Sequence, residues 1–360
     1  MKYFCALPLM LLLLTSCGDE KKEETLNRDK TDWAFYKLKG NVKTVSQKSY
    51  TYIDGVKGES TRDDQGQPDS DMEFDDKGML IVQKLYRIAN IPMEETTFSG
   101  RDKIIKKTQY ISDKPGLISQ YQYDETGKIN TSITRRNPDN TQFDRIEMKL
   151  KDGKVSEKTT YNAQNNPIDI ITYDYDKDGN LSGENMFLGI QSVQVQSKYK
   201  YDSKKRKIAE TSATHDKLNS TTVYEYDEND HLISSITTDD KGEVEYTEKC
   251  GYDDKGNLRS QVTYRRADNA ESVELYTYDK NNNMTEATVT EKGAVVMKAM
   301  FAYDKFNNLT STKSTDAKGA TVNSRTYQYS YDSGNNWNKK IISINGKQKL
   351  IVERTFTYHK

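Results

Sequence analysis

The sequence predicts an all-β protein built as a repetitive array of antiparallel β-hairpins, with two strands in each repeat of about 25 residues. Three observations support this prediction. A Tyr-Asp pair recurs along most of the chain, an Asp-x-x-Gly or Asp-x-x-Asn step follows it, and no sustained helical spacing of apolar residues occurs after residue 40.

The repeat is anchored by tyrosine. Its clearest copy is Tyr252-Asp253-Asp254-Lys255-Gly256-Asn257-Leu258. Degenerate copies extend the series upstream, with Phe74 and Phe98 in the tyrosine position and Leu150 in the position before Tyr175. Tyr52 and Tyr358 fit as the end members, so the mean period is about 25 residues. The full Tyr-Asp pairs begin at Tyr123, Tyr175, Tyr201, Tyr226, Tyr252, Tyr278, Tyr303 and Tyr331.

The Asp-x-x-Gly step is typical of a type I turn followed by a left-handed residue in a G1 bulge. The left-handed position holds residues that tolerate positive φ. These are Gly78, Gly127, Gly179, Asp230, Gly256, Asn282, Asn307 and Asn335. Lys205 is the exception, and we expect a different turn there. A second turn about half a period later, such as Asp239-Asp240-Lys241-Gly242, completes two strands per repeat.

This turn places the anchor tyrosine opposite the following leucine, so that Tyr252 faces Leu258 and Tyr303 faces Leu309. Alternation then gives one face lined with tyrosine and aliphatic residues and one solvated face. The 25 tyrosines and the low apolar content of 34% suit a thin sheet rather than one thick core. We expect a twisted or spiralling single sheet, open or partly curled, that unfolds over a broad range.

The N-terminal segment predicts secretion and lipid attachment. Residues 1–16 have the basic start and short apolar stretch of a signal peptide. They end at Cys17, which we expect to carry the lipid. Residues 17–31 then form a disordered acidic tether. Residues 32–45, which include Trp33 and Leu38, are expected to cap the edge of the first strand and lead into it. The repeat domain covers residues 46–360.

Two resemblances follow from these motifs. The Tyr-Asp-x-x-Gly-Asn-Leu repeat, with a second tyrosine two residues earlier, resembles the YD repeat of the RHS family over roughly residues 40–360. The resemblance implies a spiralling β-sheet, which in long members encloses a toxin domain. Leu14-Thr15-Ser16-Cys17 resembles a bacterial lipobox, and the acidic run after it resembles the surface-export signal of Bacteroidota lipoproteins.

Few residues indicate a catalytic or metal-binding site. We expect no enzyme, because the three histidines, His215, His231 and His359, form no nucleophile–base pattern. The only metal candidate is calcium at Asp174, Asp176 and Asp178, which match positions 1, 3 and 5 of a calcium loop in a strand–turn–strand frame. No other cofactor is expected. Cys250 occupies a tyrosine position and is interpreted as an inward-facing apolar residue, with a reactive thiol as the alternative.

The charge distribution and the predicted lipid anchor limit the classes of partner that we expect. Lys and Arg total 54 against 55 Asp and Glu, interspersed along the chain, so nucleic acid is not an expected partner. The leading hypothesis is a non-enzymatic, lipid-anchored protein of the outer membrane, exposed at the cell surface. There the β-repeat array would act as a structural or binding scaffold for an unknown surface protein or glycan. The alternatives are carbohydrate binding on the tyrosine-lined face and, from the RHS resemblance alone, a toxin-associated role without an effector domain.

Overall fold

The computed structural model describes residues 27–189 and 193–360. Four-residue helix α1 (Asp32–Phe35) and the 3-10 turns η1 (Arg28–Lys30), η2 (Ile88–Asn90) and η3 (Arg266–Asp268) are the helical elements of this part of the chain. The strands are β1 (Val42–Ile53), β2 (Val56–Ser60), β3 (Asp69–Phe74), β4 (Leu80–Tyr86), β5 (Pro92–Phe98), β6 (Ile104–Ile111), β7 (Lys114–Tyr123), β8 (Asn130–Arg136), β9 (Gln142–Lys151), β10 (Lys154–Asn162), β11 (Pro167–Tyr175), β12 (Leu181–Leu188), β13 (Val193–Tyr201), β14 (Lys207–Thr214), β15 (Lys217–Tyr226), β16 (Leu232–Asp239), β17 (Val244–Tyr252), β18 (Leu258–Arg265), β19 (Ala270–Tyr278), β20 (Met284–Glu291), β21 (Ala294–Tyr303), β22 (Leu309–Asp316), β23 (Thr321–Tyr331), β24 (Trp337–Ile344) and β25 (Lys347–Tyr358).

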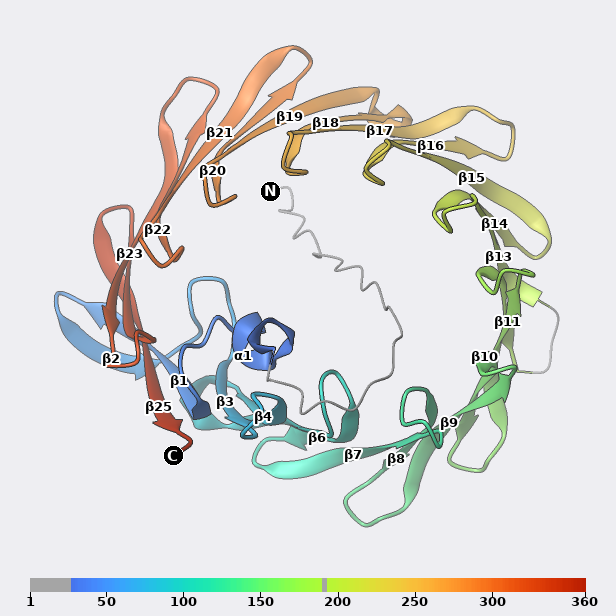
Figure 1. Ribbon diagram of the computed structural model, residues 1–360, viewed down its shortest axis with the longest axis horizontal. Coiled ribbons are helices and arrows are strands. Elements are labelled where there is room, and N and C mark those ends of the chain that lie inside the picture. The colour runs from blue at the N-terminus through green and yellow to red at the C-terminus, as the bar shows by residue number, and fades with distance from the viewer. Residues whose placement is uncertain (1–26, 190–192) are drawn as a thin grey trace.

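The strands form a closed antiparallel ring (Figure 1). β1 pairs with β3, each later strand pairs with the next, and β25 pairs back with β1 from Val42 opposite Tyr358 to Thr51 opposite Leu350. All of the 25 strands except β2 therefore belong to a ring of 24, and β2 is a short arm hydrogen-bonded to the end of β1. The prediction of an all-β antiparallel array with two strands per repeat is confirmed.

The expectation of an open or partly curled sheet is wrong, because the two end strands meet. The predicted bulges explain the closure. The register shifts between Gly251 and Tyr252, and the same shift recurs where the other anchor strands enter their turns, as between Ala302 and Tyr303. A bulge bends its strand and increases the local twist. Repeated around the array in one sense, these bends bring β25 to β1.

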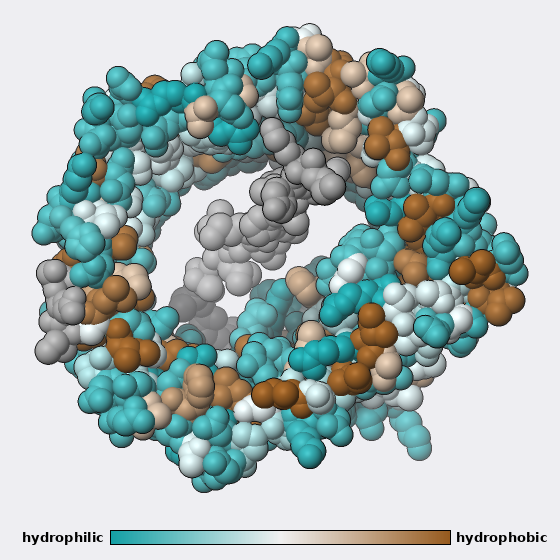
Figure 2. Space-filling view, turned by 180° about the vertical axis from the view of Figure 1, so that it is seen from behind, coloured by the Kyte–Doolittle hydropathy of each residue, from teal (hydrophilic) through white to brown (hydrophobic). Residues whose placement is uncertain are grey.

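Closure fixes the size of the ring. Twenty-four strands spaced by about 4.8 Å give a circumference of at least ~115 Å, and hence a diameter of at least ~37 Å. A ring this wide encloses a central opening, which the space-filling view shows (Figure 2). This opening distinguishes the ring from a small barrel, whose interior is filled by the side chains of its own strands.

The segment from η1 through α1 lies inside the ring (Figure 1). Trp33 is fully buried in a core cluster with Leu38, Val42, Val45, Met72, Phe74 and Leu80. Phe74 is an anchor residue and Leu80 is its partner across the hairpin, so the anchor face of the sheet is the inner face of the ring. The expected cap over the strand edge is thus corrected. Trp33 and Leu38 cover the inner face of β1, β3 and β4, whereas β25 covers the edge of β1.

A second segment also lies inside the ring, namely the loop between β2 and β3 (Figure 1). The Tyr327 hydroxyl donates to Asp64 of this loop at 2.9 Å. Tyr327 belongs to the other core cluster, with Ile342 and Val352, on the inner face of β23, β24 and β25. Both core clusters therefore lie where the ends of the chain meet, and the wall elsewhere is a thin sheet.

The predicted left-handed positions are confirmed, with φ between 63° and 80° at all eight residues from Gly78 to Asn335. The prediction for Lys205 is wrong, since its φ is 63° and it closes the same turn. The Asp202 side chain accepts the backbone N–H groups of Lys204 and Arg206 at 2.9 Å each, and it pairs with the Arg206 guanidinium at 2.7 Å. These bonds offset the strain of about 1–2 kcal/mol that a residue with a Cβ incurs there.

Seen from behind, the ring is largely hydrophilic, with scattered apolar residues (Figure 2). The outer face of the wall carries charged residues. Ion pairs cross between neighbouring strands on this face, including Lys298 with Glu286 at 2.9 Å and Lys84 with Glu95 at 3.1 Å. None of the helices that the described residues form is long and apolar enough to cross a membrane.

Two glycine substitutions separate turn strain from packing inside the ring. Gly78 and Gly242 share a φ of +80°, but an added Cβ at Gly78 meets the Trp33 ring at 2.4 Å, whereas one at Gly242 meets nothing within 4 Å. We expect Gly242→Ala to cost about 1–2 kcal/mol of unfolding free energy. Gly78→Ala should cost about 1–3 kcal/mol more, because Trp33 must move. Urea unfolding of both variants measures the difference, and equal losses would contradict the packing of Trp33 against this turn.

Candidate functional site

The inner face of the ring is lined by the anchor tyrosines and by tyrosines two residues before them, and many of their hydroxyl groups are bonded to the preceding repeat. Each of six hydroxyls donates to the backbone carbonyl of a residue 19 or 20 positions earlier, at the start of the strand after the previous turn. These are Tyr123 to Ile104 (2.9 Å), Tyr175 to Val155 (2.9 Å), Tyr226 to Lys207 (2.9 Å), Tyr252 to Leu232 (2.9 Å), Tyr278 to Leu258 (2.7 Å) and Tyr329 to Leu309 (3.0 Å).

These bonds explain why the repeat uses tyrosine. The ring packs on the aliphatic partner across the hairpin, as the pairings Tyr252–Leu258 and Tyr303–Leu309 confirm. The hydroxyl donates to a backbone carbonyl of the preceding repeat, close to its bulge. In the last two units the hydroxyls of Tyr331 and Tyr358 reach the turn aspartates Asp304 and Asp332 instead. The anchor tyrosines hold neighbouring repeats together, so the tyrosine-lined face is first of all a structural surface.

Removing one of these hydroxyls should weaken the contact between repeats. We expect Tyr252→Phe to lower the unfolding free energy by about 1 kcal/mol, because the Leu232 carbonyl loses its donor. Tyr264→Phe is the matched control, since that hydroxyl lies on the outer face 3.4 Å from Asn269 and should contribute almost nothing. Urea denaturation followed by circular dichroism measures both. An equal loss in the two variants would show that the hydrogen bonds on the inner face contribute no more to the free energy of unfolding than the one on the outer face.

The turns that follow the anchor tyrosines form a rim of carboxylates and amides. At the Asp253 turn, the carboxylate accepts the backbone N–H groups of Lys255 and Asn257 and the Asn257 side-chain amide, each at 2.9 Å. Amide side chains also bridge successive turns, as between Asn283 and Asn307 at 3.1 Å. The polar groups of the rim therefore bond to their own turn and to the next.

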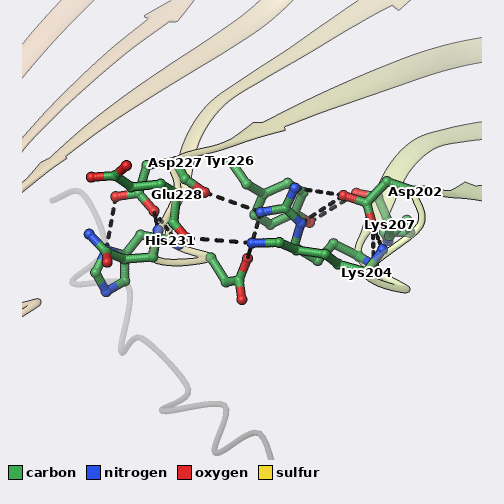
Figure 3. Close-up of polar contacts among 10 residues, drawn as sticks. Asp202, Lys204, Lys207, Tyr226, Asp227, Glu228 and His231 are labelled. Atoms are coloured by element: carbon green, nitrogen blue, oxygen red, sulfur yellow. Dashed lines mark hydrogen bonds and ion pairs between the residues drawn. The ribbon is translucent and has the colours of Figure 1, made fainter.

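Two neighbouring turns show this bonding in detail (Figure 3). Arg206, from the turn that begins at Asp202, donates to Asp230 of the next turn at 2.7 Å and to the Asp227 carbonyl at 3.1 Å. Lys204 reaches the same Asp230 at 2.8 Å. His231 takes the place that asparagine holds in other turns, with Nδ1 3.0 Å from Asp227, and its ring stacks on Tyr252 at 4.5 Å. His231 thus has a structural role.

The carboxylates of the rim should make the folded protein less stable at acidic pH. Hydrogen bonds from the side chains of Asn180, Asn257 and Asn283 lower the pKa of Asp176, Asp253 and Asp279. A folded-state pKa below the unfolded value stabilises the protein above the unfolded pKa of about 3.9, and this contribution is lost as the pH falls through the lowered pKa. We expect the thermal midpoint to change little from pH 7 to pH 5.5 and to fall below about pH 4. A midpoint that rises on acidification would contradict this linkage.

The calcium candidates are close in sequence but do not form a metal cluster. The Asp176 carboxylate accepts the backbone N–H groups of Asp178 and Asn180 and the Asn180 side-chain amide. Asp174 lies beside the Asn185 amide at 3.3 Å. Within residues 27–189 and 193–360, no group of three or more His, Cys, Asp and Glu is placed to hold a metal. Calcium binding at this turn thus remains a prediction from the sequence, which a calcium titration of thermal stability tests.

The structure bears on one of the two cysteines that remain after the predicted signal-peptide cleavage and not on the other. Cys17, the predicted lipid attachment site, lies outside the described residues. Cys250 is half-buried on the inner face among the tyrosines, and burial raises the pKa of its thiol to about 11. The thiol is therefore protonated at neutral pH, as befits a packed residue rather than a reactive one.

A cleft of about 400 Å³, which was not predicted from the sequence, lies between the segment inside the ring and the wall. Phe306, Tyr331, Trp337 and Arg354 line it on the wall side. These residues belong to neighbouring units of the wall, and they face the segment inside the ring only because the chain closes on itself. Two departures from the repeat could have indicated this cleft from the sequence. Trp337 stands in the position that Leu232, Leu258 and Leu309 hold in other units. Phe306 stands in a turn position that is polar or glycine elsewhere.

Neither a protein-family model nor a curated protein sequence matches the chain. Among solved structures, the TcdB2–TccC3–Cdc42 complex is similar to it at 12% sequence identity, over 82% of this chain and 19% of that chain, with a TM-score of 0.37. This chain thus spans about a fifth of the TcdB2–TccC3 chain. A porin-like protein from Bacteroides uniformis is similar at 10% identity, over 88% of this chain and 98% of that one, with a TM-score of 0.20. Neither likeness bears on what this chain binds, and the RHS family remains a resemblance in the motif.

Proposed function

We propose that this chain is a non-enzymatic lipoprotein of the outer membrane, anchored through Cys17 and exposed at the cell surface, whose ring is a rigid scaffold for binding. One structural observation carries the scaffold assignment. Tyrosine hydroxyls such as those of Tyr252 and Tyr278 donate to the preceding repeat, the turn carboxylates fix their own turns, and the wall that the repeats form is closed. Such a wall holds residues that depart from the repeat in fixed positions. The anchor and the location come from the sequence.

The anchor is tested with a matched pair of cysteine variants. Cells that produce the full chain are fed a radiolabelled fatty acid and separated into membrane and soluble fractions. We expect the wild type and Cys250→Ser to be labelled and to sediment with outer membranes, and Cys17→Ser to lose both the label and the membrane association. Labelling of Cys17→Ser would refute attachment at that residue.

Surface exposure is tested separately by adding protease to intact cells. The wild-type ring should be cleaved or shed, while a periplasmic marker protein stays intact. Full protection of the ring on intact cells, with cleavage after lysis, would place it on the periplasmic side and refute surface display.

Carbohydrate binding is the second candidate, and the structure changes where it would occur. The anchor tyrosines are engaged in contacts between repeats, so the tyrosine-lined face as a whole is not the proposed surface. The cleft beside Trp337 and Arg354 combines aromatic, amide and cationic side chains, and this combination favours a sugar ligand there. The toxin-associated alternative is favoured by none of the contacts described above.

A further inference from the structure

The cleft lies inside the ring, near the place where the two ends of the chain meet. Its inner side is the segment that carries Arg28, Lys37 and Lys39, and its outer side is the wall at β24 and β25 together with three neighbouring turns. Asn336 fixes the two sides to each other, because its side chain accepts from the Lys39 N–H at 2.7 Å and donates to the Lys39 carbonyl at 2.8 Å. The cleft is therefore a built feature of the closed ring.

Arg354 is the cation on the wall side of the cleft. Its guanidinium lies over the Trp337 ring, 3.7 Å from the ring centroid, and its Nε donates to Gln47 at 2.9 Å. Among the described residues, no carboxylate lies within 4.0 Å of Arg354, and its two terminal nitrogens donate to no protein group. Burial lowers the pKa of Arg354 to about 10. A partly desolvated cation without a counter-ion is costly, and a bound anion would offset that cost.

A second cation, Lys340, lies near Trp337 but outside the lining of the cleft, and the carboxylates of Asp63 and Asp64 partly balance its charge. Lys340 lies 5.6 Å from the centroid of the same Trp337 ring, and burial lowers the pKa of its ammonium group. No ion pair with a carboxylate within 4.0 Å is formed by Lys340 among the residues that the structure describes. Asp29 is the one carboxylate among the residues that line the cleft, against Arg28, Lys37, Lys39 and Arg354. The balance of charge favours an anionic ligand.

The same cleft offers flat apolar surface and amide groups. The rings of Phe306 and Tyr331 pack with centroids 4.8 Å apart. The Asn308 amide donates to the Tyr331 hydroxyl at 2.9 Å and fixes that ring. Aromatic faces pack against the C–H faces of sugar rings, side-chain amides bond to sugar hydroxyls, and a guanidinium binds carboxylate or sulfate oxygens in pairs.

We propose that this cleft binds a carboxylate- or sulfate-bearing sugar unit, with Arg354 binding the acidic group and Phe306 and Tyr331 packing against the sugar ring. The proposal rests on the proposed scaffold function and names its ligand class. It does not depend on the lipid anchor or on the side of the membrane, so failure of the binding test leaves the location intact, and failure of surface display leaves binding intact.

The test is isothermal titration of the purified full chain in detergent with three probes. They are trigalacturonate, a sulfated chondroitin disaccharide and neutral galactotriose. We expect at least one acidic probe to bind about tenfold or more tightly than the neutral one. Inorganic sulfate is the fourth titrant. Equal affinity for inorganic sulfate and the acidic sugars would overturn the assignment to sugar, and binding by none of the probes would overturn the proposal altogether.

Two variants assign the binding to named residues. Arg354→Gln and Phe306→Asn should each weaken binding of the acidic probe by about tenfold or more. Phe306→Asn is expected to fold normally, because Asn281 occupies the same position in the preceding turn, and so it keeps the test valid if Arg354→Gln is unstable. Arg265→Gln is the matched control, since Arg265 pairs with Asp268 at 3.0 Å outside the cleft, and it should bind as the wild type does. Wild-type affinity in Phe306→Asn would overturn the site.

Discussion

Replacement of Trp33 with alanine is expected to lower the free energy of unfolding by about 3–5 kcal/mol. Trp33 has no exposed surface, its indole N–H donates to the Val42 carbonyl at 2.8 Å, and the Arg28 guanidinium lies 5.0 Å from the ring centroid. The substitution opens a cavity in the larger core cluster and leaves the Val42 carbonyl without its donor. Since a domain is stable by only about 5–15 kcal/mol, the loss is a large share.

The matched control is Phe35→Ala, two residues along the same helix. Phe35 is 67% exposed, so its removal should cost about 1 kcal/mol or less. Urea unfolding gives the two free energies, and trypsin reports the local effect, because Lys30, Lys37 and Lys39 should become rapidly cleaved only in Trp33→Ala. Similar losses in both variants would show that the segment inside the ring does not depend on the tryptophan.

Introduction of a carboxylate at Val352 is expected to open the ring. Val352 has no exposed surface and packs with Tyr327 and Ile342 on the inner face. An unpaired charge there is too costly to bury, so β25 should leave the wall in Val352→Asp. The free edges of β1 and β24 would then pair with other molecules. Sedimentation velocity should show concentration-dependent oligomers, and scattering should show a larger radius of gyration.

Two further variants make this result specific. Thr355→Asp, on the exposed face of the same strand, should remain a closed monomer. Thr44 and Thr357 are paired across β1 and β25, with their hydroxyl oxygens 2.6 Å apart. A disulfide made by Thr44→Cys with Thr357→Cys should therefore keep Val352→Asp monomeric until it is reduced. A Val352→Asp protein that stays monomeric without the disulfide would show that β25 is not needed for closure.

The local features of the fold were predictable from the sequence because each depends on a few adjacent residues. The turns at Gly256 and Asn307 and the pairing of Tyr252 with Leu258 follow from the chemistry of the Asp-x-x-Gly step. Lys205 misled the prediction, because the side chains of Asp202 and Arg206 stabilise a turn that the residue itself disfavours. A rule based on single-residue preference does not include such neighbours.

Closure and the cleft were not predictable in the same way. Closure depends on the sum of small bends over 24 strand pairings, and a modest change in each bend gives a spiral instead. The cleft depends on closure, since Lys39 and Asn336 meet across 297 positions of sequence. The repeat pattern also does not state which face turns inward. The packing of Trp33 against Phe74 and Leu80 shows it, as does the hydrogen bond from Tyr327 to Asp64.

Closure has a consequence for how such a chain can evolve. An antiparallel ring joins its ends only with an even number of strands, and a whole repeat adds or removes two, so duplication of one unit keeps the parity. It also changes the angle that every neighbouring pair must make. An open solenoid lengthens one module at a time without disturbing the modules already present. In the closed ring, a duplication would change the packing between all neighbouring strands at once. Related proteins with this architecture should therefore differ in loop lengths and surface residues far more often than in the number of repeats.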